Sequence, residues 1–319
     1  MSIQELHSKL SPLLAKLSEQ KLKVKAKFKH RLKKWLLPIF GVGVAGFLIG
    51  VFNPAYFIVP IISLVITSIT AIIIAVKYGN GLKEVRSSLK NQVFAKAVKA
   101  LYPDLNYEPD SFLTEQRYNE SQLFSSADRY NGEDYFEGMI DKTHVTFSEL
   151  HTQRRIQTKD STTYETIFQG VLLIADFNKH FNGTTLVQPD FAERFLGKWL
   201  GAGLQRLASR LQVVKLENAE FEKYFVVNSS DQIEARYLIS TSFMERILKL
   251  RAKYDKEISL SFINNKVYIG VNSHRNFFEA PKKLDYSDPK IIDSFVRDLS
   301  YIVDIIDLLD LNVRIWSKG

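Results

Sequence analysis

The sequence contains no cysteine, and this absence excludes several kinds of site at once. The chain can form neither a disulfide bond, nor a thiolate nucleophile, nor a zinc site with cysteine ligands. Charge is also missing locally: residues 35–76 contain no Asp, Glu, Lys or Arg, although these types make up 24% of the chain. A charge-free stretch of this length indicates a change of solvent, from water to the hydrocarbon core of a membrane.

Two apolar runs, residues 36–52 and 55–76, fill this stretch and meet at Asn53-Pro54. A helix needs about 20 residues to cross a hydrocarbon core of about 30 Å, and Asn-Pro favours a tight turn. We therefore predict a transmembrane helical hairpin over residues 35–76. A signal peptide is the main alternative for the first run. It is disfavoured because the basic segment before the run is too long and a second run follows directly.

Positive charge is concentrated beside the predicted hairpin. Residues 1–99 contain 16 Lys and Arg against 3 Asp and Glu, a net charge of +13, whereas the remaining 220 residues carry −5. Because basic flanks stay in the cytoplasm, we expect both termini on the cytoplasmic side of the membrane. The sequence pI of about 9.3 reflects this membrane-adjacent charge, so we expect no nucleic-acid partner.

The N-terminal segment, residues 1–34, combines an amphipathic stretch at helical spacing with a basic run in which Lys alternates with apolar residues. We favour a helix or loose segment over a strand for the basic run. It either lies on anionic headgroups or forms a solvated coiled-coil arm. The side chains expected to contact anionic lipid are Lys21, Lys23, Lys25, Lys27, Lys29, Arg31, Lys33 and Lys34. After the hairpin, residues 77–103 are predicted to form a basic juxtamembrane helix.

The glycines of the first span have two possible interpretations. Gly41, Gly43 and Gly46 match the dinucleotide fingerprint GxGxxG, but the motif lies inside the membrane segment without the strand or acidic residue that it requires. We therefore expect no cofactor. Gly43, Gly46 and Gly50 share one helical face, where small residues allow close helix packing. That face packs either on the second helix of the same chain or on another copy in a homo-oligomer.

Residues 104–319 have the pattern of a cytoplasmic α+β domain with a mixed, mainly antiparallel sheet and packed helices. We expect strands at 135–140, 144–155, 166–176, 184–187, 213–216 and 225–227, with a hairpin formed by 258–263 and 267–271. Helices are expected from about residue 110 to 124, from 242 to about 254, and after Asp288-Pro289.

Two stretches of this domain resemble a known family. LFSSADRYNGEDYFEGMIDKTHVTFSELH (123–151) and KLENAEFEKYFVVNSSDQIEARYLISTSFMERI (215–247) are similar to signatures of the bacterial domain of unknown function 3137 family, and SLSFINNKVYIGV (259–271) follows them. The resemblance implies a bacterial inner-membrane protein with a cytoplasmic α+β domain. It implies no activity, because the family has none assigned, and it transfers no catalytic residue.

Two groups of residues in this domain are candidates for a functional site. Clustered carboxylates suit a divalent cation or acid–base work, and the candidates are Asp128, Glu133, Asp134 and Glu149. Residues 131–134 alternatively form a simple turn. The aromatic residues Phe191, Phe195 and Trp199 lie at helical spacing among basic residues and suit a membrane or partner surface. His144 and His151 fall on opposite faces of one strand, so we expect no shared metal.

Our leading hypothesis is a membrane-anchored interaction or scaffold module that binds an unknown protein partner or the inner leaflet, rather than an enzyme. Two alternatives remain open: an enzyme that acts on a membrane-associated substrate through the carboxylates of residues 128–149, and a subunit of an oligomeric membrane assembly.

Overall fold

The structure is a computed structural model, and it describes residues 2–52, 58–177, 180–190, 211–254, 257–273, 275–281, 284–309 and 311. The chain divides into two compact units. The first comprises residues 1–96 with 281–292, and the second comprises residues 97–280 with 293–319. The two units are described separately below.

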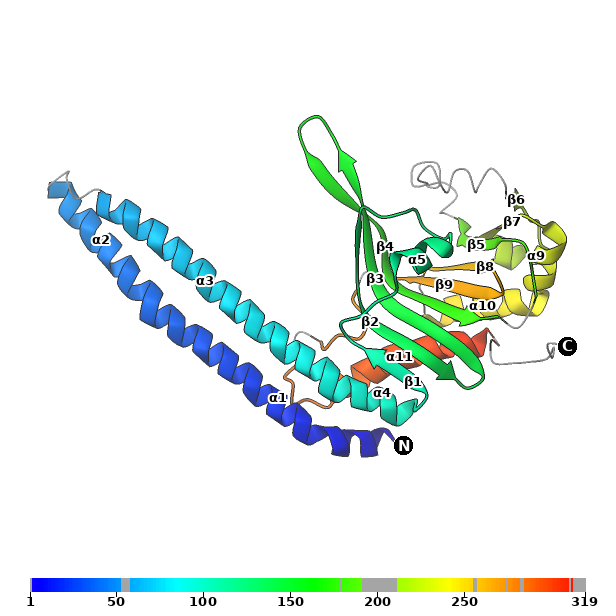
Figure 1. Ribbon diagram of the computed structural model, residues 1–319, viewed down its shortest axis with the longest axis horizontal. Coiled ribbons are helices and arrows are strands. Elements are labelled where there is room, and N and C mark those ends of the chain that lie inside the picture. The colour runs from blue at the N-terminus through cyan, green and yellow to red at the C-terminus, as the bar shows by residue number, and fades with distance from the viewer. Residues whose placement is uncertain are drawn as a thin grey trace. The chain divides into compact units, whose positions relative to one another are not determined.

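The first unit is a long antiparallel pair of helices (Figure 1). The first side of the pair is α1 (Ile3–Arg31), followed by the π-helical turn η1 (Leu32–Leu36) and α2 (Leu37–Phe52). The second side is α3 (Ile58–Leu89), followed by η3 (Lys90–Phe94), and the next helix, α4 (Ala95–Leu101), lies mostly in the second unit. The basic run of residues 21–31 is therefore helical, and α1 packs along α3, with Leu6, Leu10, Leu14 and Leu17 buried.

A proline explains the π-helical turn η1. Pro38 has no backbone N–H to donate to the carbonyl of residue 34, and its ring clashes with that carbonyl in a regular helix. The widened turn from Leu32 to Leu36 lies immediately before this position, where a π-bulge accommodates the missing bond. The helix therefore continues through the boundary between its charged and apolar parts.

Two contacts fix the register of α1 against α3. The rings of Phe28 and Tyr78 stack with their centroids 4.3 Å apart. One turn away, a Cβ atom placed on Gly81 would lie 3.1 Å from Val24 Cγ1. Because these contacts lie outside the apolar runs, the helix pair continues as a two-helix stalk beyond the predicted membrane segment.

The second unit is built on one antiparallel sheet in the order β1-β2-β3-β4-β9-β8-β5-β7-β6. The α+β prediction is therefore confirmed. The strands are β1 (Leu105–Glu108), β2 (Arg129–Ile140), β3 (Thr143–Gln157), β4 (Thr162–Asp176), β5 (Thr185–Pro189), β6 (Gln212–Val213), β7 (Phe225–Ser229), β8 (Ile258–Ile263) and β9 (Lys266–Asn272). The ends of β3 and β4 extend from the sheet as a two-stranded arm (Figure 1).

Helices cover both faces of the sheet. The short α5 (Glu115–Glu120) places Tyr118 on one face, in a core cluster with Leu150, Phe168 and Leu172. The opposite face carries α10 (Thr241–Tyr254) and the part of α11 (Lys290–Leu308) that belongs to this unit. On that face Phe278 contacts both Phe136 of β2 and Phe295 of α11. The remaining helices are α8 (Ala219–Glu222) and α9 (Gln232–Leu238).

Several local predictions are correct, and three are wrong, the first being the strand expected at 213–216, which is only the short β6. The hairpin of β8 and β9 forms as predicted, with Asn264 and Asn265 both at positive φ. The predicted helix from residue 110 to 124 is only α5, because Thr114 caps it and Ser121 ends it. Residues 131–134 are not a turn but part of β2. A Cβ atom on Gly132 would lie 2.6 Å from the Glu149 carbonyl oxygen. Glycine at this position therefore allows β2 and β3 to approach closely.

Candidate functional site

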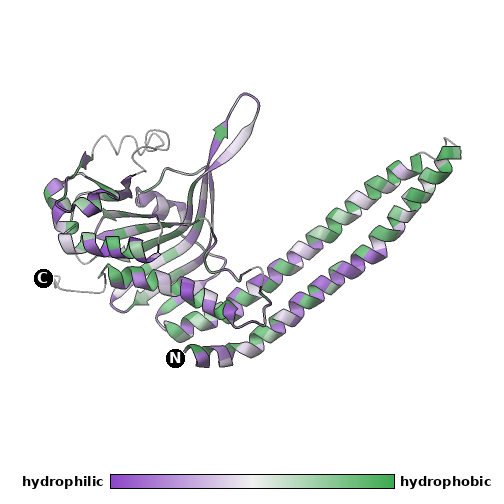
Figure 2. Ribbon diagram, turned by 180° about the vertical axis from the view of Figure 1, so that it is seen from behind, coloured by the Kyte–Doolittle hydropathy of each residue, from purple (hydrophilic) through white to green (hydrophobic). Residues whose placement is uncertain are grey.

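The apolar part of the helix pair is the most prominent candidate functional region. Two helices are long and apolar enough to cross a membrane, one within 3–49 and one within 58–101. Figure 2 shows mostly hydrophobic colour on α2 and the first half of α3, and mixed colour on α1. Most large side chains of α2 are exposed, and Phe40 and Leu48 are more than half exposed. An apolar surface of this extent, unlike the buried core of the second unit, is suited to lipid.

Two of the three predicted packing glycines lie against the second helix. A Cβ atom on Gly43 would lie 2.4 Å from Ser63 Oγ, and one on Gly46 would lie 2.5 Å from Val59 Cγ1. The Ser63 hydroxyl also donates a hydrogen bond of 2.8 Å to the carbonyl oxygen of Ile39. These contacts hold α2 against α3 in the apolar segment, and both glycines pack within the chain. The surroundings of Gly50 lie outside the described residues.

The eight predicted lipid-binding residues lie along the stalk at increasing distance from the apolar segment. Lys33 and Lys34 are exposed next to Trp35, and the Lys34 ammonium lies 5.7 Å from the centre of the Trp35 ring. Lys21 lies 13 residues earlier, or about 20 Å at 1.5 Å per residue. Its ammonium lies 3.8 Å from the centre of the Tyr286 ring, so this lysine has a contact within the first unit.

The predicted carboxylates Glu133 and Asp134 lie close together in the second unit. The register of β2 against β3 shifts between Glu133 and Phe136, and Asp134 adopts a positive φ of 59° in this bulge. The bulge turns Asp134 inward, where it is completely buried. Its carboxylate accepts a hydrogen bond of 2.5 Å from the hydroxyl of Tyr107 on β1. Burial, and then the negative charge of Asp134, raise the pKa of Tyr107 far above its usual value.

A third carboxylate joins this pair from a distant part of the sequence. Glu279 follows β9, and one carboxylate oxygen from each of Glu133, Asp134 and Glu279 lies within 4.8 Å of the others. Such a group can share a proton or hold a divalent cation. Acidic clusters are common without either role, so we assign no metal to it. Nothing in the sequence around Glu279 indicates this proximity, because it depends on the order of the strands.

The other two predicted carboxylates have different partners. Asp128 accepts a hydrogen bond of 2.6 Å from the backbone N–H of Arg155, and this bond holds the base of the β3–β4 arm. Glu149 stands opposite Glu133 in the register and is 5% exposed. The Asp298 carboxylate accepts a hydrogen bond of 2.5 Å from Arg275, and this bond raises the pKa of Arg275. The negative charge of Glu149 contributes to the same shift in pKa.

Two further acidic residues of the second unit, Asp231 and Glu234, have structural roles. Asp231 is the N-cap of α9 and accepts hydrogen bonds from Ile233 and Glu234. The Glu234 carboxylate accepts bonds of 2.7 Å from the backbone amides of Asn182 and Gly183, so it stabilises that turn. The candidate aromatic surface of Phe191, Phe195 and Trp199 lies outside the described residues.

Comparison with known proteins supports the resemblance drawn from the sequence. Residues 166–311 match the family described as "Protein of unknown function (DUF3137)". This match confirms the predicted resemblance to the family over residues 166–311. None of the curated proteins matches this sequence significantly. Among solved structures, the mycobacterial trehalose monomycolate transport factor A, TtfA, is 9% identical, with a TM-score of 0.34, and the match covers 67% of this chain and 92% of that chain. A likeness this remote carries no functional argument.

Proposed function

We propose that this protein is a membrane-anchored cytoplasmic module whose helix pair holds an α+β interaction domain at the inner face of a bacterial membrane. The observation that carries the proposal is the charge pattern of the helix pair. Its exposed apolar end contains no charged residue, and basic residues flank it on both helices. A helix pair in water would not expose so many large apolar side chains, whereas lipid accommodates them.

The orientation follows from the positive-inside rule applied to both helices. Lys33 and Lys34 precede the apolar segment on one helix, and Lys77 and Lys83 follow it on the other. The turn between the runs has no charge that would oppose this orientation. Both basic flanks therefore stay in the cytoplasm, together with the sheet domain that follows the second helix.

The stalk refines the expected role of the basic residues. If the helices cross the membrane close to its normal, Lys21 is about 20 Å from the headgroup-adjacent Lys34, about twice the Debye length of 8–10 Å. Anionic lipids then attract mainly Lys29, Arg31, Lys33 and Lys34. The more distant lysines contribute to topology and solubility instead. The packing of α1 on α3 favours the coiled-coil arm over a segment that lies flat on the membrane.

A labelling experiment tests the anchor and its sidedness. Because the chain has no cysteine, single substitutions give one reactive thiol each. Ser161→Cys places a thiol at the tip of the β3–β4 arm, and Asn53→Cys places one at the predicted outer turn. In intact spheroplasts, a membrane-impermeant maleimide should label only Asn53→Cys. Ser161→Cys should react only after permeabilisation, and labelling of Ser161→Cys in intact spheroplasts would refute the proposed orientation.

The interaction role requires a separate test. The full chain, solubilised in a mild neutral detergent, should recover the same protein partner from cell membranes in independent pull-downs. A variant that lacks the sheet domain but keeps residues 1–103 is the matched control. Loss of the partner with this control supports the proposal, whereas equal recovery assigns the interaction to the anchor.

A further inference from the structure

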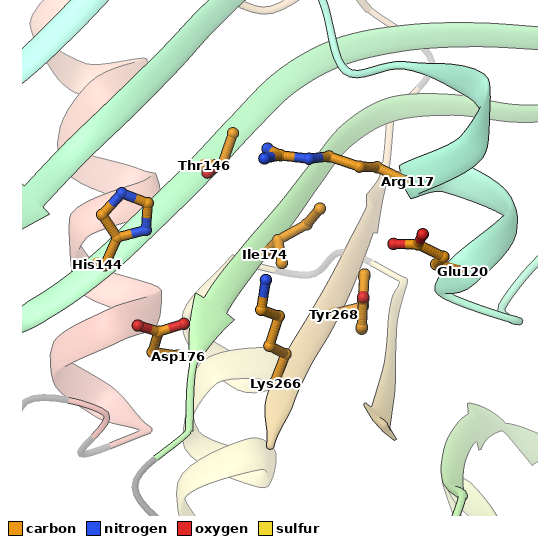
Figure 3. A pocket seen from close by; sticks show the side chains of 8 residues that line it. All are labelled: Arg117, Glu120, His144, Thr146, Ile174, Asp176, Lys266 and Tyr268. Atoms are coloured by element: carbon orange, nitrogen blue, oxygen red, sulfur yellow. The ribbon is translucent and has the colours of Figure 1, made fainter. Parts of the chain in front are cut away.

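A small polar pocket on the α5 side of the sheet is not used by the proposed anchor function. Its lining residues are Arg117, Glu120, His144, Thr146, Ile174, Asp176, Lys266 and Tyr268. All of them belong to the second unit, so the pocket is formed within one compact part of the chain. It lies between α5 and one face of the three strands β3, β4 and β9 (Figure 3).

The strand register builds the floor of the pocket. Thr146 of β3 pairs with Ile174 of β4, and Ile174 pairs with Tyr268 of β9. In the adjacent row Asp176 pairs with Lys266. Directly paired residues point to the same face, so these side chains form two neighbouring rows that run across the sheet. The fixed spacing of an antiparallel sheet thus preorganises the pocket without a ligand.

The basic groups of the pocket converge on one place. Figure 3 shows Arg117 extending from α5 over the sheet, His144 at the opposite side and the Lys266 ammonium rising between them toward Ile174. The buried hydroxyls of Thr146 and Tyr268 belong to the same lining. The arrangement therefore offers two permanent positive charges, a protonatable imidazole and two hydroxyl groups.

Two carboxylates, Glu120 and Asp176, also line the pocket, and Glu137 lies near it. Glu120 accepts a hydrogen bond of 2.9 Å from the Gln116 side chain, on its own helix. Glu137 lies 3.9 Å from His144 and accepts a bond of 2.8 Å from the Tyr135 hydroxyl. Asp176 pairs with Lys266 in the register. The lining thus combines two carboxylates with two basic side chains, an imidazole and two hydroxyl groups.

We propose that this pocket binds a phosphate group, carried either by a free phosphorylated compound or by a lipid headgroup. The planar guanidinium of Arg117 donates two parallel hydrogen bonds to phosphate oxygens, and Lys266 adds a mobile point charge. Thr146 and Tyr268 donate to the remaining oxygens.

The test is a phosphorus NMR titration of the full chain in nanodiscs of phosphatidylcholine, at constant ionic strength. The probes are inorganic phosphate and glycerol 3-phosphate. Wild-type protein should bind each probe saturably at one site. Lys266→Gln and Arg117→Gln should each weaken binding by about tenfold or more, because each removes a hydrogen bond to a charged group. Lys266 is exposed, so its substitution leaves the fold intact, which circular dichroism checks.

Two further variants make the result specific. Lys249→Gln removes an exposed lysine of α10 that is not part of the pocket, and it should leave binding unchanged. Asp176→Asn removes the negative charge beside Lys266 and should tighten binding, a gain that partial unfolding does not produce. Unsaturable binding, equal affinities of wild type and Lys266→Gln, or displacement of phosphate by an equal concentration of acetate would overturn the proposal.

The two probes distinguish the sources of the phosphate. Equal affinity for both assigns recognition to the phosphate group alone, and tighter binding of glycerol 3-phosphate assigns it to a headgroup-like ester. The outcome does not depend on membrane orientation, so failure of the site and failure of the anchor are separable.

Discussion

Val24 and Gly81 face each other across the stalk, and a Cβ atom built on Gly81 lies 3.9 Å from the Val24 Cβ. This separation is within the 3.5–4.5 Å range, with a mean of about 3.8 Å, that disulfide bonds span. The pair belongs to the charged part of the helix hairpin, outside the apolar runs. The contact therefore reports whether the two helices stay paired beyond the membrane.

We predict that the double variant Val24→Cys/Gly81→Cys forms an intramolecular disulfide under mild oxidation. The chain has no other cysteine, so the mobility shift on non-reducing gels reports this bond alone. Val24→Cys/Gly79→Cys is the control, because nothing lies within 4 Å of a Cβ atom at Gly79. Equal cross-linking of the two pairs would show that the stalk helices are not held in this register.

A second prediction concerns the glycine contacts inside the apolar segment. Gly46→Leu should disrupt the helix hairpin by about 1–3 kcal/mol, because a Cβ atom there already meets Val59 Cγ1 at 2.5 Å. Gly41→Leu is the matched control, with nothing within 4 Å. Thermal unfolding in detergent, followed by circular dichroism, measures the difference. If Gly46→Ala/Val59→Ala is more stable than Gly46→Leu, the loss of stability is assigned to this contact. Equal stability of Gly46→Leu and Gly41→Leu would contradict the prediction.

The sequence predicts the parts of the fold that depend on local chemistry. The absence of charge over residues 35–76 predicts the apolar hairpin, and Asn264-Asn265 predicts the turn between β8 and β9, since both residues adopt positive φ. The start of β2 was predicted wrongly for a physical reason. Asn131-Gly132 is a typical turn pair, but Gly132 is required here by the close approach of Phe112 and of the Glu149 carbonyl oxygen.

The candidate sites are less predictable because they depend on long-range strand order. Glu279 joins Glu133 and Asp134 only because the loop after β9 returns to the bulge in β2. The pocket has the same origin, since His144 and Lys266 share it through the pairing of β3, β4 and β9. A single sequence contains no signal that would predict either the carboxylate group or the pocket.

A third prediction concerns the bond between Tyr107 and Asp134. Tyr107→Phe should lower the free energy of unfolding by about 1–3 kcal/mol, because it removes a donor from a buried carboxylate. Tyr135→Phe is the control, since its bond to Glu137 lies nearer the surface and should matter less. Chemical denaturation at pH 7 measures both values, and equal losses would argue against a special role of the Asp134 bond.

A fourth prediction follows from the buried tyrosines. Burial raises the pKa of Tyr107, Tyr118, Tyr130 and Tyr301 above the usual value of about 10. Their contribution to stability is complete below pH 10. It is lost as the pH rises above that value, because the unfolded chain then releases protons that the folded chain retains. In a pH titration of the folded protein followed by tyrosinate absorbance, these tyrosines should therefore ionise at higher pH than the exposed ones. A single transition near pH 10 would refute this prediction.

The last prediction separates the lipid contacts of the near and distant lysines. Lys33 and Lys34 lie next to Trp35, so each should contribute about 1 kcal/mol of attraction to anionic headgroups. Replacing both with Gln should lower the retention of phosphatidylglycerol by about tenfold or more. Lys21→Gln/Lys23→Gln removes the same charge about 20 Å further along the helix and should have little effect, because salt screens charges beyond about 10 Å. Mass spectrometry of the lipids that remain bound to the full chain in mixed nanodiscs measures both variants. An equal loss in the two would place the distant lysines at the membrane surface as well, and would mean that the stalk lies along the membrane instead of projecting from it.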